Sequence, residues 1–194
     1  MSDYSLHAHH QRFATWAAVT AARSSSLCRF TRDQGLLLVK ESGLAGISPR
    51  WLDLPDPSAF DEFHRDLRMS ICSSARIALP TDKSDISHGI AAKLINVYFK
   101  TLFLSAPALE EPSPEAMAKA NALHPPIDRL LLTELTIKNV GGRAKFWRKM
   151  RDKGWSRFDS DDYESIIEQI SRVTSGALWT IEEHWLDPEV SRRH

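Results

Sequence analysis

Cysteine is scarce in this sequence, and a long apolar run is missing altogether. Cys28 and Cys72 are its only cysteines, too few for a disulfide scaffold, a structural zinc site or a four-cysteine iron–sulfur cluster. We expect both to be free thiols, and we expect neither a metal nor another cofactor. No stretch approaches the roughly eighteen uninterrupted apolar residues that cross a bilayer, so no membrane partner is expected.

The sequence also has no excess of charge of either sign. Lysine and arginine together number 25, as do aspartate and glutamate, which gives a formal net charge of zero. Overall charge therefore provides no attraction for nucleic acid, and any recognition of DNA has to be local. The first five residues lack a positively charged region followed by an apolar run, so nothing indicates secretion and we expect a cytoplasmic protein.

Apolar residues recur mainly at helical spacing, and the alternation typical of strands does not persist. The sequence predicts an all-α fold of about eight helices in a single domain, residues 1–194, because this length suits one hydrophobic core. The most apolar segment, His88 to Ser105, is predicted to be the central buried helix. The other predicted helical segments are 5–23, 31–42, 58–74, 115–123, 128–137, 143–153, 159–173 and 177–186.

Particular residues predict the faces and starts of three of these helices. The apolar residues that recur at helical spacing in the first helix, and so predict its apolar face, are Leu6, Phe13, Trp16 and Ala17. Ser58 predicts the N-cap of the third, since a serine hydroxyl accepts a hydrogen bond from the first turn. Asp128 is likewise predicted to cap the helix that follows it, a role that needs no catalysis.

A polar stripe interrupts the most apolar helix. Lys93, Asn96 and Lys100 stand at positions i, i+3 and i+7, so their side chains lie along one face. Such a stripe faces either solvent or a cleft. Solvent is the more common case for charged residues, and the pattern alone leaves both open.

The residues around this stripe resemble the catalytic core of helix-hairpin-helix DNA glycosylases. The shared order begins with a glycine-containing hairpin at Gly89 and a lysine, Lys93, that opens the second helix. An apolar run with an asparagine follows, and then the sequence Pro126-Ile127-Asp128 at a helix start. The resemblance spans Gly89 to Leu132.

The resemblance implies an all-helical fold, double-stranded DNA as partner, and roles for particular residues. Lys93 matches the nucleophilic lysine of the family and Asp128 its catalytic aspartate. Gly89 matches a hairpin glycine whose backbone approaches DNA phosphates, and Asn96 and Lys100 are candidate DNA contacts beside it. We therefore predict a DNA glycosylase-like protein that removes a damaged or modified base.

The chemistry is consistent with these residue types. Breaking an N-glycosidic bond creates positive charge at the sugar C1′, which a nearby carboxylate such as Asp128 stabilises. An amine attacks the same carbon and forms a Schiff base. Burial and the positive end of a helix both lower the pKa of a lysine, so the sequence predicts a lowered pKa for Lys93.

A basic segment follows further along the chain. Residues 138–157 contain eight basic residues against one acidic residue, interleaved with aromatic ones. Such a segment suits contacts with a phosphate backbone, and the candidate DNA contacts in it are Arg143, Lys145, Arg148 and Lys149. The alternative is a solvated face balanced by residues 158–194, which hold nine acidic residues against three basic ones. The corresponding alternative function is a non-enzymatic helical module that binds DNA or another protein.

Overall fold

The computed structural model of the chain describes residues 4–23, 30–79, 85–105 and 113–185. Over these residues the chain is helical and contains no β-strand, which confirms the predicted all-α fold. The α-helices of this part of the chain are α1 (Leu6–Ala22), α2 (Arg32–Glu41), α3 (Phe60–Ala78), α4 (His88–Phe99), α5 (Pro114–Ala122), α6 (Arg129–Ile137), α7 (Ala144–Lys153) and α8 (Ser160–Val173).

Short helices of other types connect them. The 3₁₀-helices are η1 (Leu44–Gly46), η2 (Trp51–Asp53), η3 (Pro57–Ala59), η6 (Val140–Gly142), η7 (Trp155–Arg157) and η8 (Leu178–His184). A π-helical turn, η5 (Lys100–Leu104), continues α4. The last predicted helix, residues 177–186, is thus the 3₁₀-helix η8 and not an α-helix.

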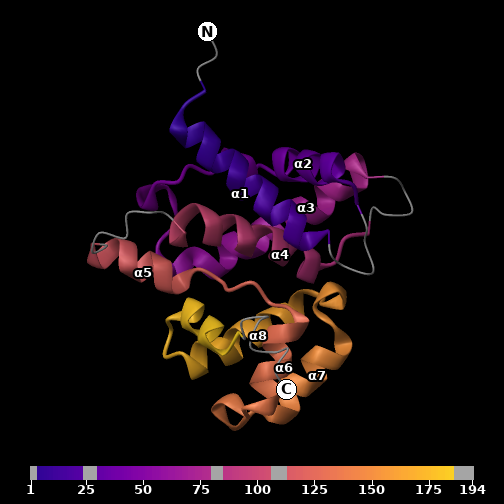
Figure 1. The fold of residues 1–194 in the computed structure, drawn as a ribbon, viewed down its shortest axis with the longest axis vertical. Helices are drawn as coiled ribbons and strands as arrows, with labels where there is room; N and C mark the ends of the chain where they lie inside the picture. The colour runs from indigo at the N-terminus through magenta and orange to yellow at the C-terminus, as the bar shows by residue number, and fades with distance from the viewer. Residues whose placement is uncertain (1–3, 24–29, 80–84, 106–112, 186–194) are drawn as a thin grey trace, which may run out of the picture.

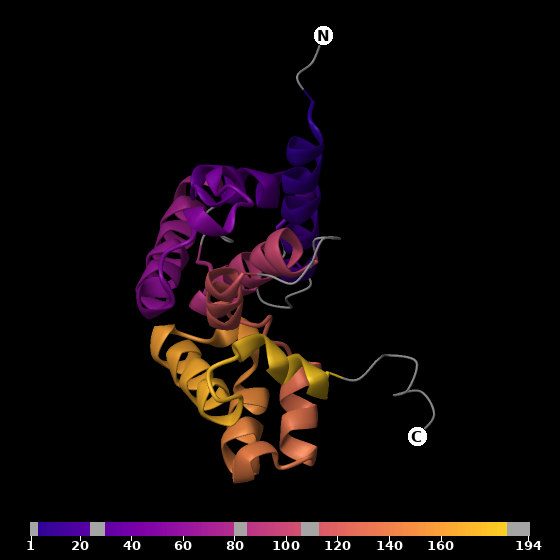
Figure 2. The same ribbon diagram turned by 90° about the vertical axis from the view of Figure 1, so that its left-hand side faces the viewer.

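The helices form two groups with α4 between them. Figure 1 shows α1, α2 and α3 above α4, and α6, α7 and α8 below it. The turned view in Figure 2 shows the same separation, with the indigo and purple helices at one end and the orange and yellow segments at the other. Within the described residues, no helix has both the length and the apolar character needed to cross a bilayer.

The central helix α4 is enclosed on several sides. Ser87 caps it by accepting a hydrogen bond from the backbone N–H of Ile90 at 3.1 Å. Ten of its twelve residues are buried, including Lys93 and Asn96. It packs against α1 and α3 from one group of helices and against η7 and α8 from the other. The prediction of a central buried helix is confirmed.

The apolar core has two parts, and α4 contributes to both. One part gathers side chains from α1, α2, α3 and α4, among them Leu38, Ile71 and Tyr98. The other gathers side chains from α6, α7, α8 and η8 together with Ala92 of α4. Trp155 of η7 packs against both parts. Helix α4 and η7 therefore connect the two groups of helices.

The first helix buries a different face from the predicted one. Leu6, Phe13 and Trp16 are 85%, 52% and 48% exposed. The buried residues of α1 are Ala14, Ala18, Val19 and Ala22. The separation of two packed helices depends on the side chains at their contact, and these small residues let α1 lie close to α4. The prediction from residue size was wrong because close approach of the helices decided the packing.

Of the two predicted N-caps, Asp128 and Ser58, the structure confirms the first and contradicts the second. Oδ1 of Asp128 accepts a hydrogen bond from the backbone N–H of Leu131 at 2.9 Å, which confirms the predicted cap of α6. Ser58 does not cap α3, because it lies inside η3 and the residue before α3 is Ala59. Pro57 begins that turn instead, and proline at a helix start lacks the N–H that would need a capping partner.

Of the two cysteines, only Cys72 lies among the described residues. Cys28 lies outside the described residues. Cys72 is a free thiol, partly buried on α3, and burial raises the pKa of its side chain to about 11. A thiol with so high a pKa is almost entirely protonated at neutral pH and is a poor nucleophile.

Candidate functional site

Lys93 and Asp128 meet in the interior of the molecule. Lys93 lies in the second turn of α4 and is only 6% exposed, while Asp128 is the residue that caps α6. Nζ of Lys93 is 3.3 Å from Oδ2 of Asp128, and the side chain of Asp128 remains 18% exposed. The two residues singled out by the sequence thus form a partly buried ion pair.

The surroundings of Lys93 are aromatic and open on one side. Its Nζ lies 5.7 Å from the ring centre of Trp155 and 5.5 Å from that of Trp185. A cavity of about 400 Å³ reaches Lys93 and is also lined by Ala21, Val97, Lys100, Thr101, Ser105, Pro126 and Trp185. Burial lowers the pKa of Lys93, an effect that the carboxylate of Asp128 partly opposes. Lys93 lies beyond the first turn of α4, so burial and not the helix end accounts for the lowered pKa.

Lys93 and Asn96 of the polar stripe face a segment of chain, residues 124–128, of which 124–127 are buried. Residues 124–127 lie outside any helix, and both prolines among them lack an N–H. Nδ2 of Asn96 donates to the carbonyl oxygen of Pro125 at 2.8 Å, and Nζ of Lys93 lies 3.5 Å from the carbonyl oxygen of Ile127. These two side chains therefore supply hydrogen-bond donors to carbonyl groups of buried residues.

Two of the predicted DNA contacts are engaged elsewhere. A Cβ atom on Gly89 would lie 1.8 Å from the carbonyl oxygen of Trp155, and the N–H of Gly89 donates to the carbonyl oxygen of Phe158 at 3.1 Å. Gly89 thus allows α4 to approach η7 and does not present its backbone to a phosphate. Asn96 is 1% exposed, and its side chain is bonded within the protein, so it is not a DNA contact either.

The other predicted contacts lie nearer the surface. Lys100 forms an ion pair with Glu182 and lines the same cavity as Lys93. On α7 the described ion pairs are made by the last turn, and the exposed basic side chains of the first two turns are left for other contacts. The side chains there are Lys145, Arg148 and Lys149, which are exposed, and the half-buried Arg143 that precedes the helix.

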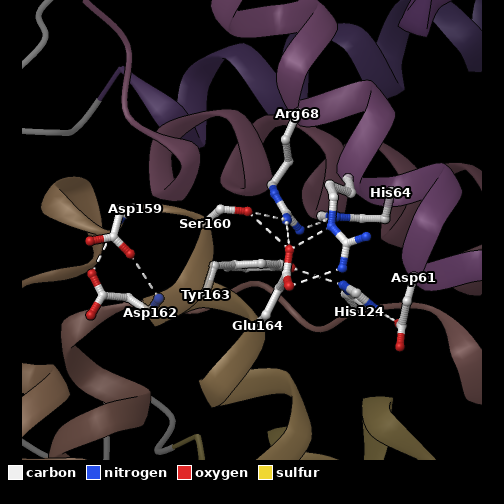
Figure 3. A network of polar contacts seen from close by, with 10 residues as sticks. Asp61, His64, Arg68, His124, Asp159, Ser160, Asp162, Tyr163 and Glu164 are labelled. Carbon is white, nitrogen blue, oxygen red and sulfur yellow. Dashed lines mark hydrogen bonds and ion pairs between the residues drawn. The ribbon is translucent and has the colours of Figure 1, made fainter.

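A second group of polar side chains lies between α3, α8 and segment 124–128. Figure 3 shows most of its side chains and the hydrogen bonds and ion pairs between them, and Asn96 joins His64 to Tyr163. Its members are Asp61, His64, Arg65, Arg68, Asn96, His124, Ser160, Tyr163 and Glu164. Four of them, His64, Arg68, Asn96 and Tyr163, are at most 1% exposed. Buried polar groups at this density are costly unless each is bonded, so the network constrains how the two groups of helices meet.

Arg68 sets the direction of these hydrogen bonds. A guanidinium only donates, so Nη1 of Arg68 donates to Nδ1 of His64 at 3.0 Å and the ring of His64 carries its proton on Nε2. This Nε2–H donates to Oδ1 of Asn96 at 2.8 Å. The amide nitrogen of Asn96 is thereby directed toward Pro125 and Tyr163.

The same direction continues to the surface. Nδ2 of Asn96 donates to the hydroxyl oxygen of Tyr163 at 2.9 Å, and this hydroxyl group donates to Nδ1 of His124 at 3.1 Å. Nε2–H of His124 then donates to Oδ1 of Asp61 at 2.8 Å. Both histidines are neutral in this arrangement, and burial lowers the pKa of His64 and of His124.

Glu164 balances the positive charge of the network. Its carboxylate accepts two hydrogen bonds from Arg65, at 2.8 and 2.9 Å, and one from Arg68 at 2.8 Å. The hydrogen bond from Arg65 is the largest of the effects that lower the pKa of Glu164 to about 2. A cavity of about 540 Å³ opens beside these groups and is also lined by Asp61, His124 and Tyr163.

The sequence pattern does not reveal this network. Helical spacing on α3 assigns Phe63 and Leu67 to the core. Both pack against it but are only partly buried, whereas His64 and Arg68 are fully buried. One feature of the sequence could have indicated the network. His64 and Arg68 stand four residues apart on the same face of α3 as Phe60, and this face is buried in the core. Polar residues at i and i+4 on an apolar stripe indicate a bonded pair in the interior.

No protein-family model, curated protein or solved structure matches this chain. Within the described residues, no three histidine, cysteine, aspartate or glutamate side chains are placed to hold a metal ion. A function must therefore be argued from the chemistry of the two groups of side chains.

Proposed function

We propose that this protein is a DNA glycosylase-like enzyme of the helix-hairpin-helix class that removes a damaged or modified base from double-stranded DNA. Lys93 acts as the nucleophile and Asp128 as the electrostatic stabiliser. The observation that carries the proposal is the 3.3 Å contact between Nζ of Lys93 and Oδ2 of Asp128 beside a cavity that reaches the amine. Cytoplasmic location is part of the proposal.

The environment of Lys93 suits attack on a sugar carbon. The lone pair of the neutral amine forms a bond to C1′ while the glycosidic bond breaks, its electron pair leaves with the base, and the base takes up a proton. The nitrogen gives up one proton, which balances the proton taken up by the base. The C1′–O4′ bond then breaks as the nitrogen lone pair forms the C=N bond, and the second proton of the nitrogen moves to O4′, which leaves an imine. Burial lowers the pKa of Lys93 and so increases the neutral fraction.

Asp128 supports the same step through its charge. Positive charge develops at C1′ as the base leaves, and a carboxylate fixed nearby stabilises it without having to reorganise. Asp128 is fixed because Oδ1 is held by the N–H of Leu131, which leaves Oδ2 directed at Lys93. The aspartate can therefore cap α6 and stabilise charge at the same time.

The cavity beside Lys93 has features that suit an extruded nucleotide. Its volume of about 400 Å³ falls within the range of small-molecule sites. The ring of Trp185 forms part of its wall, and a flipped base is commonly read by stacking on such rings. Nζ of Lys100 lies 5.1 Å from the centre of the same ring, and its positive charge suits contact with a phosphate of the DNA.

Borohydride trapping tests the enzymatic proposal. Borohydride reduces an imine between Lys93 and C1′ to a stable amine, so the protein should become covalently joined to duplexes that carry an abasic site or a damaged base. Peptide mapping should find the link on Lys93. Asp128→Asn keeps a good helix cap but removes the charge, and we expect it to slow trapping by about 100-fold.

The controls separate a specific imine from chance labelling. Lys93→Ala should abolish trapping, whereas Lys40→Ala, an exposed lysine on α2, should leave the rate unchanged. Absence of any covalent product with the folded protein across these duplexes, or trapping by Lys93→Ala at the unaltered rate, would overturn the enzymatic form of the proposal.

A second candidate function is DNA binding without catalysis, and the exposed start of α7 favours it. Lys145, Arg148 and Lys149 are exposed there, and the turn before the helix has a left-handed backbone at Asn139 and Gly141 that keeps it tight. Cations on one short element suit a phosphate backbone. The ion pair of Lys93 with Asp128 is then only a structural contact between α4 and α6.

Charge reversal tests this second function. The variant Arg148→Glu with Lys149→Glu should weaken binding to any duplex and lower the salt dependence, with the slope of log affinity against log salt falling by about 0.9 for each phosphate that the protein no longer neutralises. Arg12→Glu with Lys40→Glu, on α1 and α2 in the other group of helices (Figure 1), is the matched control and should leave binding unchanged. Equal binding by both double variants would exclude α7 as the DNA surface.

A further inference from the structure

Asp128 reaches Lys93 from the end of segment 124–128, whose placement depends on other parts of the molecule. Residues 124–127 are buried, and neither proline of the segment has an N–H to donate. The side-chain amide of Asn96 donates a hydrogen bond to the carbonyl oxygen of Pro125 in this segment, at 2.8 Å. The position of the Asp128 carboxylate therefore depends on how firmly Asn96 and the start of the segment are held.

Tyr163 holds both of these points through one hydroxyl group. Its oxygen accepts from Nδ2 of Asn96 at 2.9 Å and its proton is donated to Nδ1 of His124, the first residue of the segment, at 3.1 Å. The ring is itself fixed, because the guanidinium carbon of Arg68 lies 4.5 Å from its centre and the ring of His64 stacks on it with centres 5.3 Å apart.

We propose that Tyr163 is a positioning residue for the Lys93–Asp128 pair. By binding Asn96 and His124 at once, its hydroxyl group fixes segment 124–128 and so holds the carboxylate of Asp128 against Nζ of Lys93. The catalytic meaning of this role rests on the proposed function. The placement itself is a property of the protein alone and is measurable without DNA.

The pH at which Lys93 loses its proton reports on the position of the Asp128 carboxylate, because it depends on the charges around the amine. Asp128 and Glu182 favour its protonated form and Lys100 opposes it, while the rings of Trp155 and Trp185 lie beside the amine. Asp128 is the nearest of these charges, since its Oδ2 is 3.3 Å from Nζ. Displacement of the Asp128 carboxylate therefore lowers the pH at which Lys93 loses its proton.

The experiment measures methylation of Lys93 by formaldehyde and cyanoborohydride as a function of pH, with mass spectrometry of the peptide that contains it. Asp128→Asn should lower the midpoint of this profile by about one pH unit. Tyr163→Phe should move it in the same direction by about half a unit. Tyr98→Phe is the matched control, because it also removes a buried hydroxyl group, one on α4 that has no hydrogen-bond partner among the described residues. Its profile should equal that of the unaltered protein.

The outcomes distinguish this proposal from the proposed function. An unchanged midpoint in Tyr163→Phe, when Asp128→Asn shifts it, would overturn the positioning role, as would equal shifts in Tyr163→Phe and Tyr98→Phe. Shifts as expected together with no borohydride trapping of DNA would support the positioning role and exclude the glycosylase.

A second pair of variants covers the case in which Tyr163→Phe does not fold. The side chain of Asp61 is 75% exposed, so its replacement should not prevent folding. Asp61→Ala removes the acceptor for Nε2–H of His124, whereas Asp61→Asn keeps an acceptor oxygen there. We expect a lower midpoint in the first variant and an unaltered one in the second, and equal midpoints in both would overturn the proposal.

Discussion

The ring of His64 on α3 and the ring of His124 before α6 lie with their centres 4.3 Å apart. Both side chains are buried. Each accepts a hydrogen bond at Nδ1, His64 from Arg68 and His124 from Tyr163, so each has its only proton on Nε2. A second proton on either ring would lose the bond at Nδ1 and place a charge near the guanidinium of Arg68.

We therefore predict that the free energy of unfolding decreases as the pH falls below about 6.5. In the unfolded chain both histidines titrate near pH 6.5, whereas burial lowers their pKa in the folded protein. Below pH 6.5 the unfolded chain thus binds more protons than the folded one, until the lowered folded pKa is reached. The loss should reach up to about 1.4 kcal/mol per histidine for each pH unit, measured by urea unfolding between about pH 8 and pH 5.

A glutamine at position 64 is the control for this pH dependence. The side-chain amide of His64→Gln offers an acceptor to Arg68 and a donor to Asn96 but does not titrate. Its unfolding energy should depend less steeply on pH. The same slope in both proteins would contradict the assignment to His64. Glu164 does not interfere in this range, because its stabilising effect is lost only as the pH falls from about 4.5 toward 2.

Replacement of Lys93 by methionine should lower stability by no more than about 1 kcal/mol, while it abolishes borohydride trapping. Methionine retains an unbranched apolar chain. The carboxylate of Asp128 keeps its bond to Leu131 and remains 18% exposed, and the carbonyl oxygen of Ile127 loses only a long contact of 3.5 Å. A residue whose loss costs little stability yet abolishes the reaction has a chemical role.

Lys119→Met is the contrasting variant. Lys119 is similarly buried, but its Nζ donates to the carbonyl oxygens of Trp51 and Leu54 at 3.1 and 3.0 Å. Its loss leaves those groups unsatisfied and should cost about 1–3 kcal/mol. Thermal and urea unfolding compare the two variants. An equal loss of stability in Lys93→Met would indicate that Lys93 serves the fold.

The elements that could be predicted from the sequence are those with local signals. Helix α2 follows Thr31, whose side chain accepts from the N–H of Gln34, and ends before Gly43 in the left-handed region. The meeting of Lys93 and Asp128 follows from a pattern of residue types, and the structure places the two in contact. The start and end of α2 could be predicted because the residues that set them are neighbours in the sequence, and the Lys93–Asp128 pair because it belongs to a known motif.

The polar network and the packing of α1 could not be predicted, because their partners are distant in the sequence. His124 is bonded to Asp61, 63 residues away, and to Tyr163, 39 residues away. No local pattern in the chain brings these positions together. The motif predicts that the backbone of Gly89 approaches a phosphate. In the structure, the missing side chain of Gly89 instead makes room for the carbonyl group of Trp155, a residue distant in the sequence that only folding brings close.

The packing of α1 gives a direct test of which face is buried. Ala18→Leu should cost about 1–3 kcal/mol, because Ala18 is fully buried and added methyl groups find no room. Phe13→Ser should change stability by no more than about 0.5 kcal/mol, since Phe13 is 52% exposed. Thermal unfolding checks both, and the reverse order of effects would mean that the larger residues face the core.

Gly89→Ala should destabilise the protein by about 2–3 kcal/mol. The added Cβ would lie 1.8 Å from the carbonyl oxygen of Trp155 and 3.2 Å from Cβ of Phe158, and the bond from the N–H of Gly89 to Phe158 prevents an easy shift of α4. Gly46→Ala is the control, because a Cβ there meets nothing within 4 Å, and its stability should change by less than about 0.5 kcal/mol.

Urea unfolding and DNA affinity, measured on both glycine variants, separate packing from phosphate binding at Gly89. If Gly89 packs against η7, Gly89→Ala loses stability, and the fraction that remains folded binds DNA as well as the unaltered protein does. If the backbone of Gly89 met a phosphate, the variant would keep its stability and bind DNA more weakly. The close approach to Trp155 favours the first result, because a backbone carbonyl group already occupies the space that a phosphate oxygen would need.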